Sequence, residues 1–492
     1  MHSCIRLEFR CALKASKSKL LNMDDVTANK EPQNNHELNY YTHTSKETAS
    51  GLPNSTEVEY VLLPKGTGGA DSWLCTAGTE NILYLPLHGL LVEVSKEGAD
   101  SVRRWAAQNV HDSITREIAR LIDGNPAPTS RMGMYEEFAP TLVGLGLTAQ
   151  CTLRCAYCHS EAGSRGSEVM PVEVADAALN FVADCAERTG RKFEVSFIGP
   201  GEPTKPWQLF RHCVAAAEEL AASRGLVLQL SMPTNGFFDK KQCEYIVEHF
   251  DRVCLSFDGP SWIQNLQRPL ANGGGSFQSV YETAKFFHDN WGKGRRDFRF
   301  TIRATVSQEG LDQIDKIHSF FRSEFPCANT AYETLKPLGR GKICASSRVT
   351  IPDSNRFAYE ISRLVAEDES EIVLNSGAGS LGELKRSFCK ALAMPTMNVT
   401  PNGRVLACQC DIAADYYEYG RFSPSTGRFI FDHARIKTFQ RLTVDDFPEC
   451  TRCIARHHCA GDCHELRRVE FRRCEEIRAL LLTRLWKQVD HS

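Results

Sequence analysis

Three cysteines in the run C-T-L-R-C-A-Y-C, at Cys151, Cys155 and Cys158, constrain this chain more than any other feature. Their spacing suits a short loop that holds three irons of a [4Fe–4S] cube and leaves the fourth iron without a protein ligand. An open iron can take a small chelating molecule, so the spacing implies chemistry as well as structure. A zinc site is the alternative, because a CxxC pair is typical of zinc knuckles and His159 is a candidate fourth ligand.

The residues around the triplet favour the cluster. The apolar segment T-L-V-G-L-G-L at 141–147 predicts a buried strand that runs directly into the cysteine loop. An aromatic residue, Tyr157, precedes the third cysteine. These features resemble the radical S-adenosylmethionine (SAM) superfamily, whose signature is CxxxCxΦC with an aromatic Φ. The resemblance implies that SAM chelates the open iron.

The composition argues against nucleic-acid-binding, membrane and secreted disulfide-bonded proteins. The chain has 492 residues, which predicts two to four domains, and a net charge of −3 gives no reason to expect nucleic-acid binding. No apolar run reaches the roughly 18 residues of a membrane span, so we expect no membrane partner. Of the 20 cysteines, the clustered ones lie at 151–158 and 389–474, which indicates metal ligands in a reducing, cytoplasmic compartment rather than secreted disulfides.

The amino-terminal region divides into two parts. Residues 1–57 are polar and aperiodic, which predicts disorder. The first 22 residues carry five Lys/Arg and one acid, so both a transit peptide and a true start at Met23 stay open. Residues 58–130 predict a small α+β subdomain with strands at 59–63, 81–85 and 90–94 and a helix at 99–122. It is either a packing subdomain or, as the resemblance to peptide-modifying radical SAM enzymes implies, a domain that binds a leader peptide.

Residues 140–345 alternate between strand and helix patterns. Strands are predicted near 142–147, 192–198, 226–232, 252–257, 298–306 and 331–335, with helices at 171–189, 206–222, 239–250, 276–289 and 310–325. Such alternation predicts an α/β fold with parallel strands and right-handed crossovers. The family resemblance sharpens this to a partial (β/α)6 barrel with its site at the carboxyl ends of the strands. A linker helix and strand are expected at 346–385.

Motifs at later strand ends resemble the family's SAM contacts. F-I-G-P-G-E-P at 197–203 resembles its GGEP motif with Pro200 in place of the first glycine, although a Gly/Pro turn is the simpler interpretation. The S-M-P-T-N-G segment at 231–236 and S-F-D-G-P at 256–260 resemble two further motifs whose polar groups could hold ribose hydroxyls. A guanidinium on the fifth strand could pair with the SAM carboxylate. The implied contacts are Tyr157, Gly199, Gly201, Glu202, Pro203, Ser231, Asn235, Ser256, Asp258 and Arg303.

A cysteine-rich tail is the second strong signal. Cys389 and Cys408 flank Gly403 in the pattern Cx13Gx4C, and Cys450, Cys453, Cys459 and Cys463 follow as Cx2Cx5Cx3C before Cys474. This pattern resembles the SPASM extension, here at 386–480, and implies two auxiliary [4Fe–4S] clusters.

By the family's ligation, one cluster takes Cys450, Cys453, Cys459 and Cys474, and the nearer one takes Cys389, Cys408 and Cys463. Either Cys410 is the fourth ligand of the nearer cluster or that iron is open. Four arginines flank Cys474 and predict a solvated helix face, neutralisation of cluster charge, or a site for an acidic leader: Arg467, Arg468, Arg472 and Arg473.

The resemblance implies a radical SAM oxidoreductase that forms a 5′-deoxyadenosyl radical and removes hydrogen from a ribosomally made peptide or protein. It also implies a flavodoxin- or ferredoxin-type electron donor. The sulfatase-maturing members carry an Asp directly after the cysteine where this chain has Gln409, with Asp411 two residues later. Formylglycine formation and dehydrogenation of a small molecule stay open as alternatives, as does a non-enzymatic electron carrier. No catalytic acid or base is assigned, and Glu333 and Lys336 are not predicted to be catalytic.

Overall fold

The computed structural model describes residues 44–48, 57–63, 72–108, 110–125, 137–163, 166–337, 349–367, 372–373, 384–387, 389, 396–408 and 415–490. They form two compact units. One contains the described residues up to 125 with 452–454 and 481–490, and the other contains 137–451 and 455–480. Most of the segment predicted to be disordered, and Gln409, Cys410 and Asp411, lie outside the described residues.

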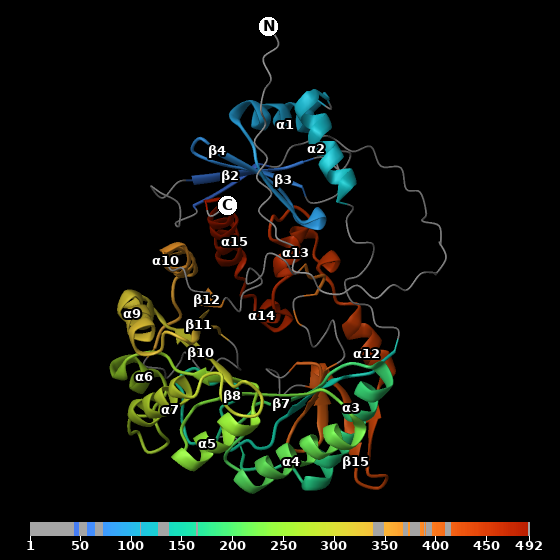
Figure 1. Cartoon of the computed structure of the whole chain (residues 1–492), viewed down its shortest axis with the longest axis vertical. Coiled ribbons are helices and arrows are strands. Elements are labelled where there is room, and N and C mark those ends of the chain that lie inside the picture. The colour runs from blue at the N-terminus through green and yellow to red at the C-terminus, as the bar shows by residue number, and fades with distance from the viewer. Residues whose placement is uncertain are drawn as a thin grey trace. The chain divides into compact units, whose positions relative to one another are not determined.

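The amino-terminal unit is an antiparallel sheet with two helices (Figure 1). The strands follow chain order: β1 (Thr44–Thr48), β2 (Glu57–Leu62), β3 (Trp73–Ala77), β4 (Glu80–Leu85) and β5 (Leu90–Glu93). Strand β1 lies in the segment predicted to be disordered, so that prediction is wrong there. The reason is its pairing with β2 along all five residues, which no pattern in its polar sequence reveals.

The helical part of this unit also differs from the prediction. Two helices, α1 (Lys96–Gln108) and α2 (Ser113–Gly124), replace the single helix expected at 99–122. The break occurs at Asp112, whose side chain accepts a hydrogen bond from the Thr115 amide at 2.9 Å in a capping box. The apolar faces of both helices pack on the sheet around Trp105 and Ile118.

The second unit is built on an eleven-stranded sheet in the order β12-β11-β10-β9-β8-β7-β6-β13-β14-β15-β16. Its six consecutive parallel strands are β6 (Leu142–Leu145), β7 (Phe193–Phe197), β8 (Leu228–Thr234), β9 (Arg252–Ser256), β10 (Arg299–Val306) and β11 (Asn329–Thr334). Strand β12 (Ile372–Val373) continues the parallel pairing. The predicted α/β fold with a partial (β/α)6 barrel is confirmed, and each strand lies within three residues of its expected bounds.

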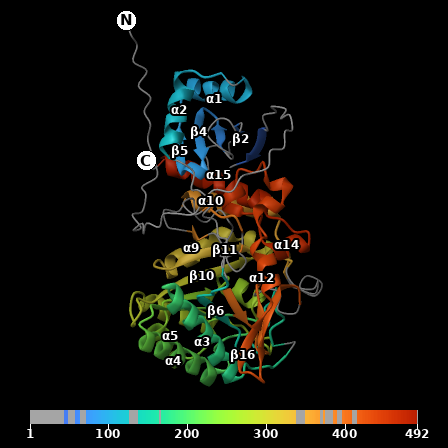
Figure 2. The same cartoon turned by 90° about the vertical axis from the view of Figure 1, so that its right-hand side faces the viewer.

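Helices cover one face of the parallel strands (Figure 2). They are α3 (Val172–Thr189), α4 (Trp207–Arg224), α5 (Lys240–His249), α6 (Ser261–Gln267), α7 (Phe277–Asp289), α8 (Gln308–Leu311), α9 (Ile314–Glu324) and α10 (Ser354–Glu367). The strand residues on the helix side, such as Phe197, Leu230 and Ile302, are fully buried, whereas the alternating residues are polar and half-buried. This alternation leaves a polar inner face where the carboxyl ends of the strands meet. Among the described helices, none has the length and apolar character that crossing a bilayer requires.

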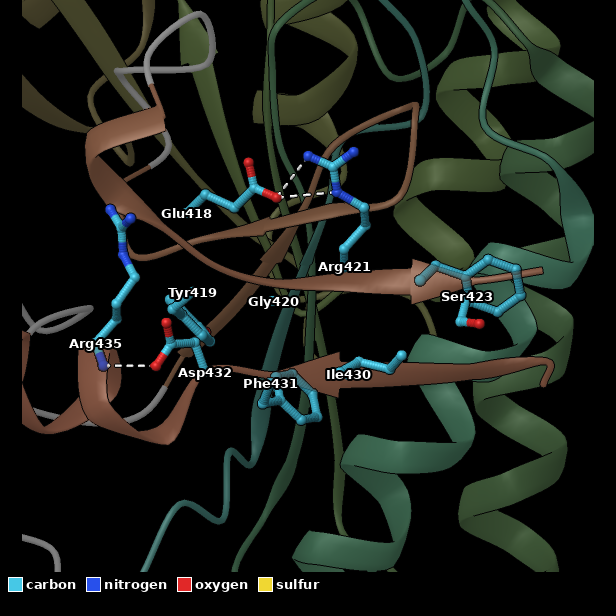
Figure 3. A pocket seen from close by; sticks show the side chains of 10 residues that line it. Glu418, Tyr419, Gly420, Arg421, Ser423, Ile430, Phe431, Asp432 and Arg435 are labelled. Atoms are coloured by element: carbon cyan, nitrogen blue, oxygen red, sulfur yellow. Dashed lines mark hydrogen bonds and ion pairs between the residues drawn. The ribbon is translucent and has the colours of Figure 1, made fainter. Parts of the chain in front are cut away.

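The tail after residue 389 extends the same sheet, which sequence analysis did not predict. Strand β13 (Thr396–Val399) pairs in parallel with β6, and β14 (Arg404–Leu406), β15 (Glu418–Ser423) and β16 (Arg428–Phe431) follow as an antiparallel ribbon. A hollow of about 580 Å³ lies on β15 and β16, where Glu418 accepts hydrogen bonds from Arg421 at 2.9 and 3.0 Å (Figure 3). The tail ends in helices α12 (His433–Gln440), α13 (Arg456–Cys459), α14 (His464–Arg468) and α15 (Cys474–Asp490).

Candidate active site

The cysteine loop follows β6 at the carboxyl edge of the sheet, where the sequence predicts it. The backbone amides of Arg154 and Ala156 donate to the carbonyls of Pro269 and Gln267, both at 2.8 Å. On its other side, the Glu202 amide donates to the Gln150 carbonyl at 2.8 Å. The loop therefore has a fixed shape that the segments after β7 and β9 impose.

Each of the three cysteine sulfurs has an N–H donor. The Asn235 side-chain amide lies 3.6 Å from Cys151 Sγ, the Arg268 guanidinium 3.9 Å from Cys155 Sγ, and the Ala162 backbone amide 3.4 Å from Cys158 Sγ. N–H groups aimed at sulfur stabilise thiolates and tune the potential of an iron–sulfur cluster. The donor set therefore fits a cluster held by three thiolates.

Burial favours the protonated form of two of the three thiols. Burial raises the pKa of Cys151 and raises that of Cys155 to about 12. Metal binding must displace these protons, so ligation and deprotonation are coupled. In the described part of the chain no three His, Cys, Asp or Glu side chains surround a common point for a single ion.

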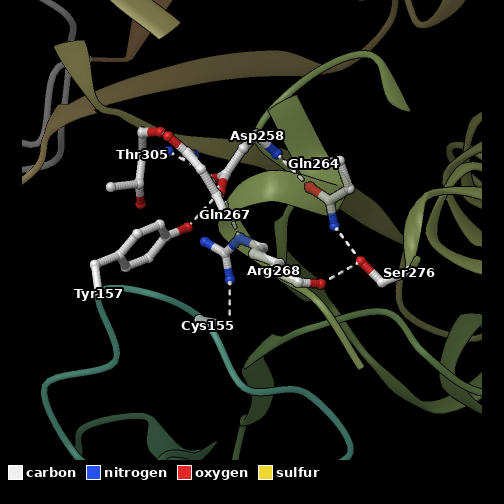
Figure 4. Close-up of polar contacts among 8 residues, drawn as sticks. All are labelled: Cys155, Tyr157, Asp258, Gln264, Gln267, Arg268, Ser276 and Thr305. Atoms are coloured by element: carbon white, nitrogen blue, oxygen red, sulfur yellow. Dashed lines mark hydrogen bonds and ion pairs between the residues drawn. The ribbon is translucent and has the colours of Figure 1, made fainter. Parts of the chain in front are cut away.

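A buried carboxylate, Asp258, ties the cysteine loop to the strand ends (Figure 4). Its Oδ2 accepts hydrogen bonds from the Tyr157 hydroxyl at 2.5 Å, Gln267 Nε2 at 2.6 Å and Arg268 Nε at 2.9 Å. Its Oδ1 accepts the Thr305 amide at 2.9 Å. The guanidinium also lies over the Tyr157 ring, 5.1 Å from the ring centre.

This network changes the role expected of Asp258. The side chain is 0% exposed and both oxygens are occupied by protein donors, so the geometry gives no support to the predicted ribose contact. Sequence reasoning missed Gln267 and Arg268, although both lie within ten residues of the S-F-D-G-P motif. No pattern marks them, because a lone Gln-Arg pair at a helix end is common. Their functional position is visible only in three dimensions.

The G-P-G-E-P turn packs directly against the cysteine loop. A Cβ atom at Gly201 would lie 2.1 Å from the Gln150 carbonyl oxygen, so only glycine fits there. At Gly199 a Cβ would meet nothing closer than 4.0 Å, which leaves space beside that backbone. The Glu202 carboxylate is buried and accepts hydrogen bonds from the Thr234 hydroxyl and the Asn235 amide, both at 2.8 Å. Burial raises the pKa of Glu202.

The predicted polar contacts on the strands lie on the inner face. Ser256 on β9 pairs in register with Arg303 on β10, and Ser231 lies on the same face of β8, the strand on the other side of β9. The Arg303 Nε atom is buried and has no hydrogen-bond partner among the described residues. The nearby Glu333 carboxylate raises the pKa of Arg303 and lies 3.5 Å from Lys336 Nζ. An orphaned guanidinium atom of this kind fits a carboxylate ligand.

Four of the described tail cysteines can be placed near one another in two pairs. Cys408 and Cys463 both lie near Tyr417, whose pKa is raised mainly by burial and also by these two thiols. Cys450 lies near Cys474, and the thiol group of Cys450 accepts a hydrogen bond from an arginine guanidinium at 3.4 Å. Cys389, Cys453 and Cys459 are half-buried.

The arginines near the tail cysteines make contacts that differ in part from the predicted solvated helix face. Arg473 is 2% exposed and pairs with the buried Asp462, so the prediction of a solvated face is wrong for it. Asp462 also accepts the Cys463 amide at 2.7 Å, and Arg473 directly precedes Cys474, so each member of the pair adjoins a predicted cluster ligand. Arg467 donates to Cys450 Sγ and lies over the Phe447 ring at 3.8 Å. These positions agree with neutralisation of cluster charge.

Comparison with known proteins agrees with this site. The model of the radical SAM superfamily matches residues 145–306, from the strand before the cysteine loop to the end of β10. The chain is a radical SAM enzyme. The cofactors of a radical SAM enzyme are SAM and the [4Fe–4S] cluster that binds it. Across the described site, the donors on the three sulfurs fit that cluster.

One curated relative and two solved structures are similar to this radical SAM enzyme. A cysteine-type anaerobic sulfatase-maturating enzyme of Clostridium perfringens is 23% identical over 337 residues, which cover 64% of this chain and 86% of the relative. The solved structure of native anSMEcpe with bound AdoMet is similar with a TM-score of 0.56 and 18% identity, covering 71% of this chain and 98% of that one. The same protein with AdoMet and a Cp18Cys peptide gives a TM-score of 0.54.

Proposed function

We propose that this chain is a peptide- or protein-modifying radical SAM oxidoreductase. The observation that carries the proposal is the set of three half-buried thiols, each with its own N–H donor, beside a turn where only glycine fits. The relationship to a sulfatase-maturating enzyme that is solved with a peptide supports a peptide or protein as the substrate. When bound, the cluster and SAM supply a 5′-deoxyadenosyl radical that removes a hydrogen atom from the substrate.

In this proposal the cysteine loop holds the cluster through Cys151, Cys155 and Cys158. Tyr157, Asp258 and Arg268 fix the shape of the loop. The space beside Gly199 admits the amino group of SAM, with Gly201, Glu202 and Pro203 shaping the turn. The guanidinium of Arg303, whose Nε has no hydrogen-bond partner among the described residues, pairs with the SAM carboxylate. Ser231, Asn235 and Ser256 present polar groups to the rest of SAM.

Two auxiliary [4Fe–4S] clusters belong to the same proposal. The ligand sets are the expected ones: Cys450, Cys453, Cys459 and Cys474 for one cluster, and Cys389, Cys408 and Cys463 for the other, with Cys410 as its candidate fourth ligand. The proximity of Cys408 and Cys463 at Tyr417, and of Cys450 to Cys474, supports this division. A cluster near the substrate would accept the electron that remains after hydrogen removal, which gives a two-electron oxidation overall.

The test is anaerobic reconstitution with iron and sulfide, followed by reduction with dithionite in the presence of SAM. We expect 5′-deoxyadenosine, and we expect its loss in the triple variant C151A/C155A/C158A together with a loss of bound iron. The matched control is Cys213→Ala, which removes a buried thiol between α4 and the sheet and leaves the product unchanged. Zinc in place of iron and sulfide would refute the proposal.

Candidate peptides then test the substrate. A peptide that loses two hydrogens supports the proposed oxidation, whereas turnover of only a sugar or an alcohol would refute it. The sulfatase-maturating relative favours a second candidate, formylglycine formation. A cysteine peptide converted to an aldehyde that reacts with a hydrazine would identify it.

A further inference from the structure

Strand β16 is the last strand at one edge of the eleven-stranded sheet, and among the described residues only β15 pairs with it. The hydrogen bonds of the described residues include none from the far side of this strand. An edge of this kind is a template on which another strand can pair. The sequence of β16 determines which strand fits it.

The direction of the backbone groups in β16 follows from one hydrogen bond. The Asp432 amide, directly after the end of the strand, donates to the Tyr419 carbonyl on β15 at 2.8 Å. Because the backbone groups of an antiparallel strand point alternately to its two sides, those of Ile430 also face β15. Phe429 and Phe431 therefore direct their N–H and C=O groups away from the sheet, where a further strand can bind them.

The side chains of β16 divide between the two faces of the sheet. Phe429 and Phe431 are half-buried, and the Phe431 ring lies 4.9 Å from the ring of Phe138 and 5.0 Å from that of Phe181. This face is therefore packed within the chain. The opposite face is exposed, and Ile430, which is 62% exposed, lines the hollow in Figure 3. In chain order the exposed face presents a cation, an apolar residue and an acid: Arg428, Ile430 and Asp432.

Both charges on this face can take part in a further contact. Arg428 forms no ion pair and no side-chain hydrogen bond with any described residue. Asp432 Oδ1 accepts the Arg435 amide at 3.0 Å and so caps α12, whereas Asp432 Oδ2 accepts no hydrogen bond in the described part of the chain.

The order of these side chains is complementary to itself. When a second copy of β16 pairs in antiparallel orientation about a two-fold axis at Ile430, Phe429 lies opposite Phe431 of the second copy and can exchange two backbone hydrogen bonds with it. In the same register Arg428 lies opposite Asp432 of the second copy, and symmetry repeats this pair. The nearest alternative registers place Arg428 opposite Ile430, or Ile430 opposite Asp432, and so lose the charge pairs.

We propose that β16 pairs with β16 of a second copy of this chain in a two-fold symmetric dimer whose two sheets are continuous. Four backbone hydrogen bonds, two pairs between Arg428 and Asp432, and the contact between the two Ile430 side chains hold the interface. The interface is small, so the dimer forms at high protein concentration and dissociates on dilution. It needs neither iron nor SAM, so the inference does not depend on the proposed function.

Sedimentation equilibrium of the full chain measures this association, over about 1–300 µM protein and with a reductant that prevents intermolecular disulfides. We expect a monomer–dimer equilibrium for the wild type. In R428E acids face each other across the axis, so we expect the dissociation constant to rise by about tenfold or more. D432K brings cations together and should have the same effect. Because D432K also removes the cap of α12, circular dichroism checks its fold.

An equimolar mixture of R428E and D432K separates strand pairing from a loss of fold. In the mixed dimer an acid again lies opposite a cation at both positions, so we expect association close to that of the wild type. The matched control is K192E, which reverses the charge of an exposed lysine just before β7 and should associate as the wild type does.

Hydrogen exchange at high and low protein concentration locates the contact. The amides of Phe429 and Phe431 should exchange more slowly at high concentration, whereas the Ile430 amide, which faces β15, should not change. A wild type that stays monomeric would overturn the proposal and leave the charges as protection of the edge against aggregation. A mixture that does not associate would also overturn it, as would an R428E variant that associates as tightly as the wild type.

Discussion

Replacing Arg268 by Met removes the positive half of the buried pair that fixes the cysteine loop. The two side chains are 6% and 0% exposed, and Arg268 Nε lies 2.9 Å from Asp258 Oδ2. Removing one partner of a buried pair costs about 3–5 kcal/mol, because the remaining charge stays buried. About 1.5–3 kcal/mol of this is the lost charge-assisted hydrogen bond. The Tyr157, Gln267 and Thr305 donors remain on Asp258, so the fold survives while the loop opens more often.

Hydrogen exchange followed by mass spectrometry measures this opening locally. Peptides from 149–163 and 257–271 should exchange roughly 100- to 4,000-fold faster in Arg268→Met, which is 3–5 kcal/mol at about 1.4 kcal/mol per tenfold. The matched control is Arg295→Met, which breaks an exposed pair with Glu248 and should cost no more than about 1 kcal/mol. The double variant D258L/R268M should not regain the loss, because Leu leaves the buried Tyr157, Gln267 and Thr305 donors without their acceptor. Equal exchange in the loop for the wild type and Arg268→Met would refute the bracing role.

Three further predictions concern other parts of the structure. Gly201→Ala should abolish stable cluster binding, measured as bound iron, because its Cβ would lie 2.1 Å from a carbonyl oxygen, whereas Gly199→Ala should retain the cluster. Asp462→Ala should leave Arg473 buried without its partner and cost about 3–5 kcal/mol, read from exchange in peptides around α14, with Asp312→Ala at an exposed pair as control. Asp112→Ala should destabilise the amino-terminal unit by about 1 kcal/mol through loss of the α2 cap. Hydrogen bonds from the Ser101 hydroxyl and the Thr115 amide hold the pKa of Asp112 at about 2, below its usual 3.8. The stabilisation by the Asp112 cap is therefore present above pH 3.8 and is lost as the pH falls towards 2. A destabilisation by Asp112→Ala that grows on acidification would contradict the assignment.

The strands and helices of the barrel could be predicted from the sequence because apolar residues recur in each with the spacing typical of a strand or a helix. Buried strands such as 193–197 alternate apolar and polar residues, and α3 presents an apolar face bounded by a left-handed Gly190. The break between α1 and α2 was not predicted, although Asp112 and Thr115 have the spacing of a helix capping box. Strand β13 could not be found, because its four buried residues show no alternation and its partner β6 lies 250 residues earlier.

The candidate site also contains residues that could be predicted from local sequence and residues that only the fold brings together. The cysteine loop and the G-P-G-E-P turn could be found because their chemistry depends on spacing within a few residues. Arg268 could not be found, because its role comes from the path of the chain after α6, which brings it back to Cys155 more than a hundred positions away. Asp258 was predicted as a ribose contact, whereas in the structure both of its oxygens accept hydrogen bonds from protein donors, and sequence alone cannot tell these two situations apart.

In both cysteine regions an arginine contacts a cysteine sulfur, and the carboxylate that neutralises the arginine charge differs in its burial. Arg268 is neutralised by the buried Asp258, and Arg467, which contacts Cys450, is neutralised by the half-exposed Glu449 at 2.8 Å. Thiolates that bind iron add negative charge beside these guanidinium groups, so each arginine contributes more in the loaded protein than in the empty one. Because Arg268 is only 6% exposed, its gain is weakened little by water or salt. Loading of the first site should therefore stabilise the cysteine loop beyond the metal–sulfur bonds themselves, and the coupling between loading and folding should be stronger there than at Cys450.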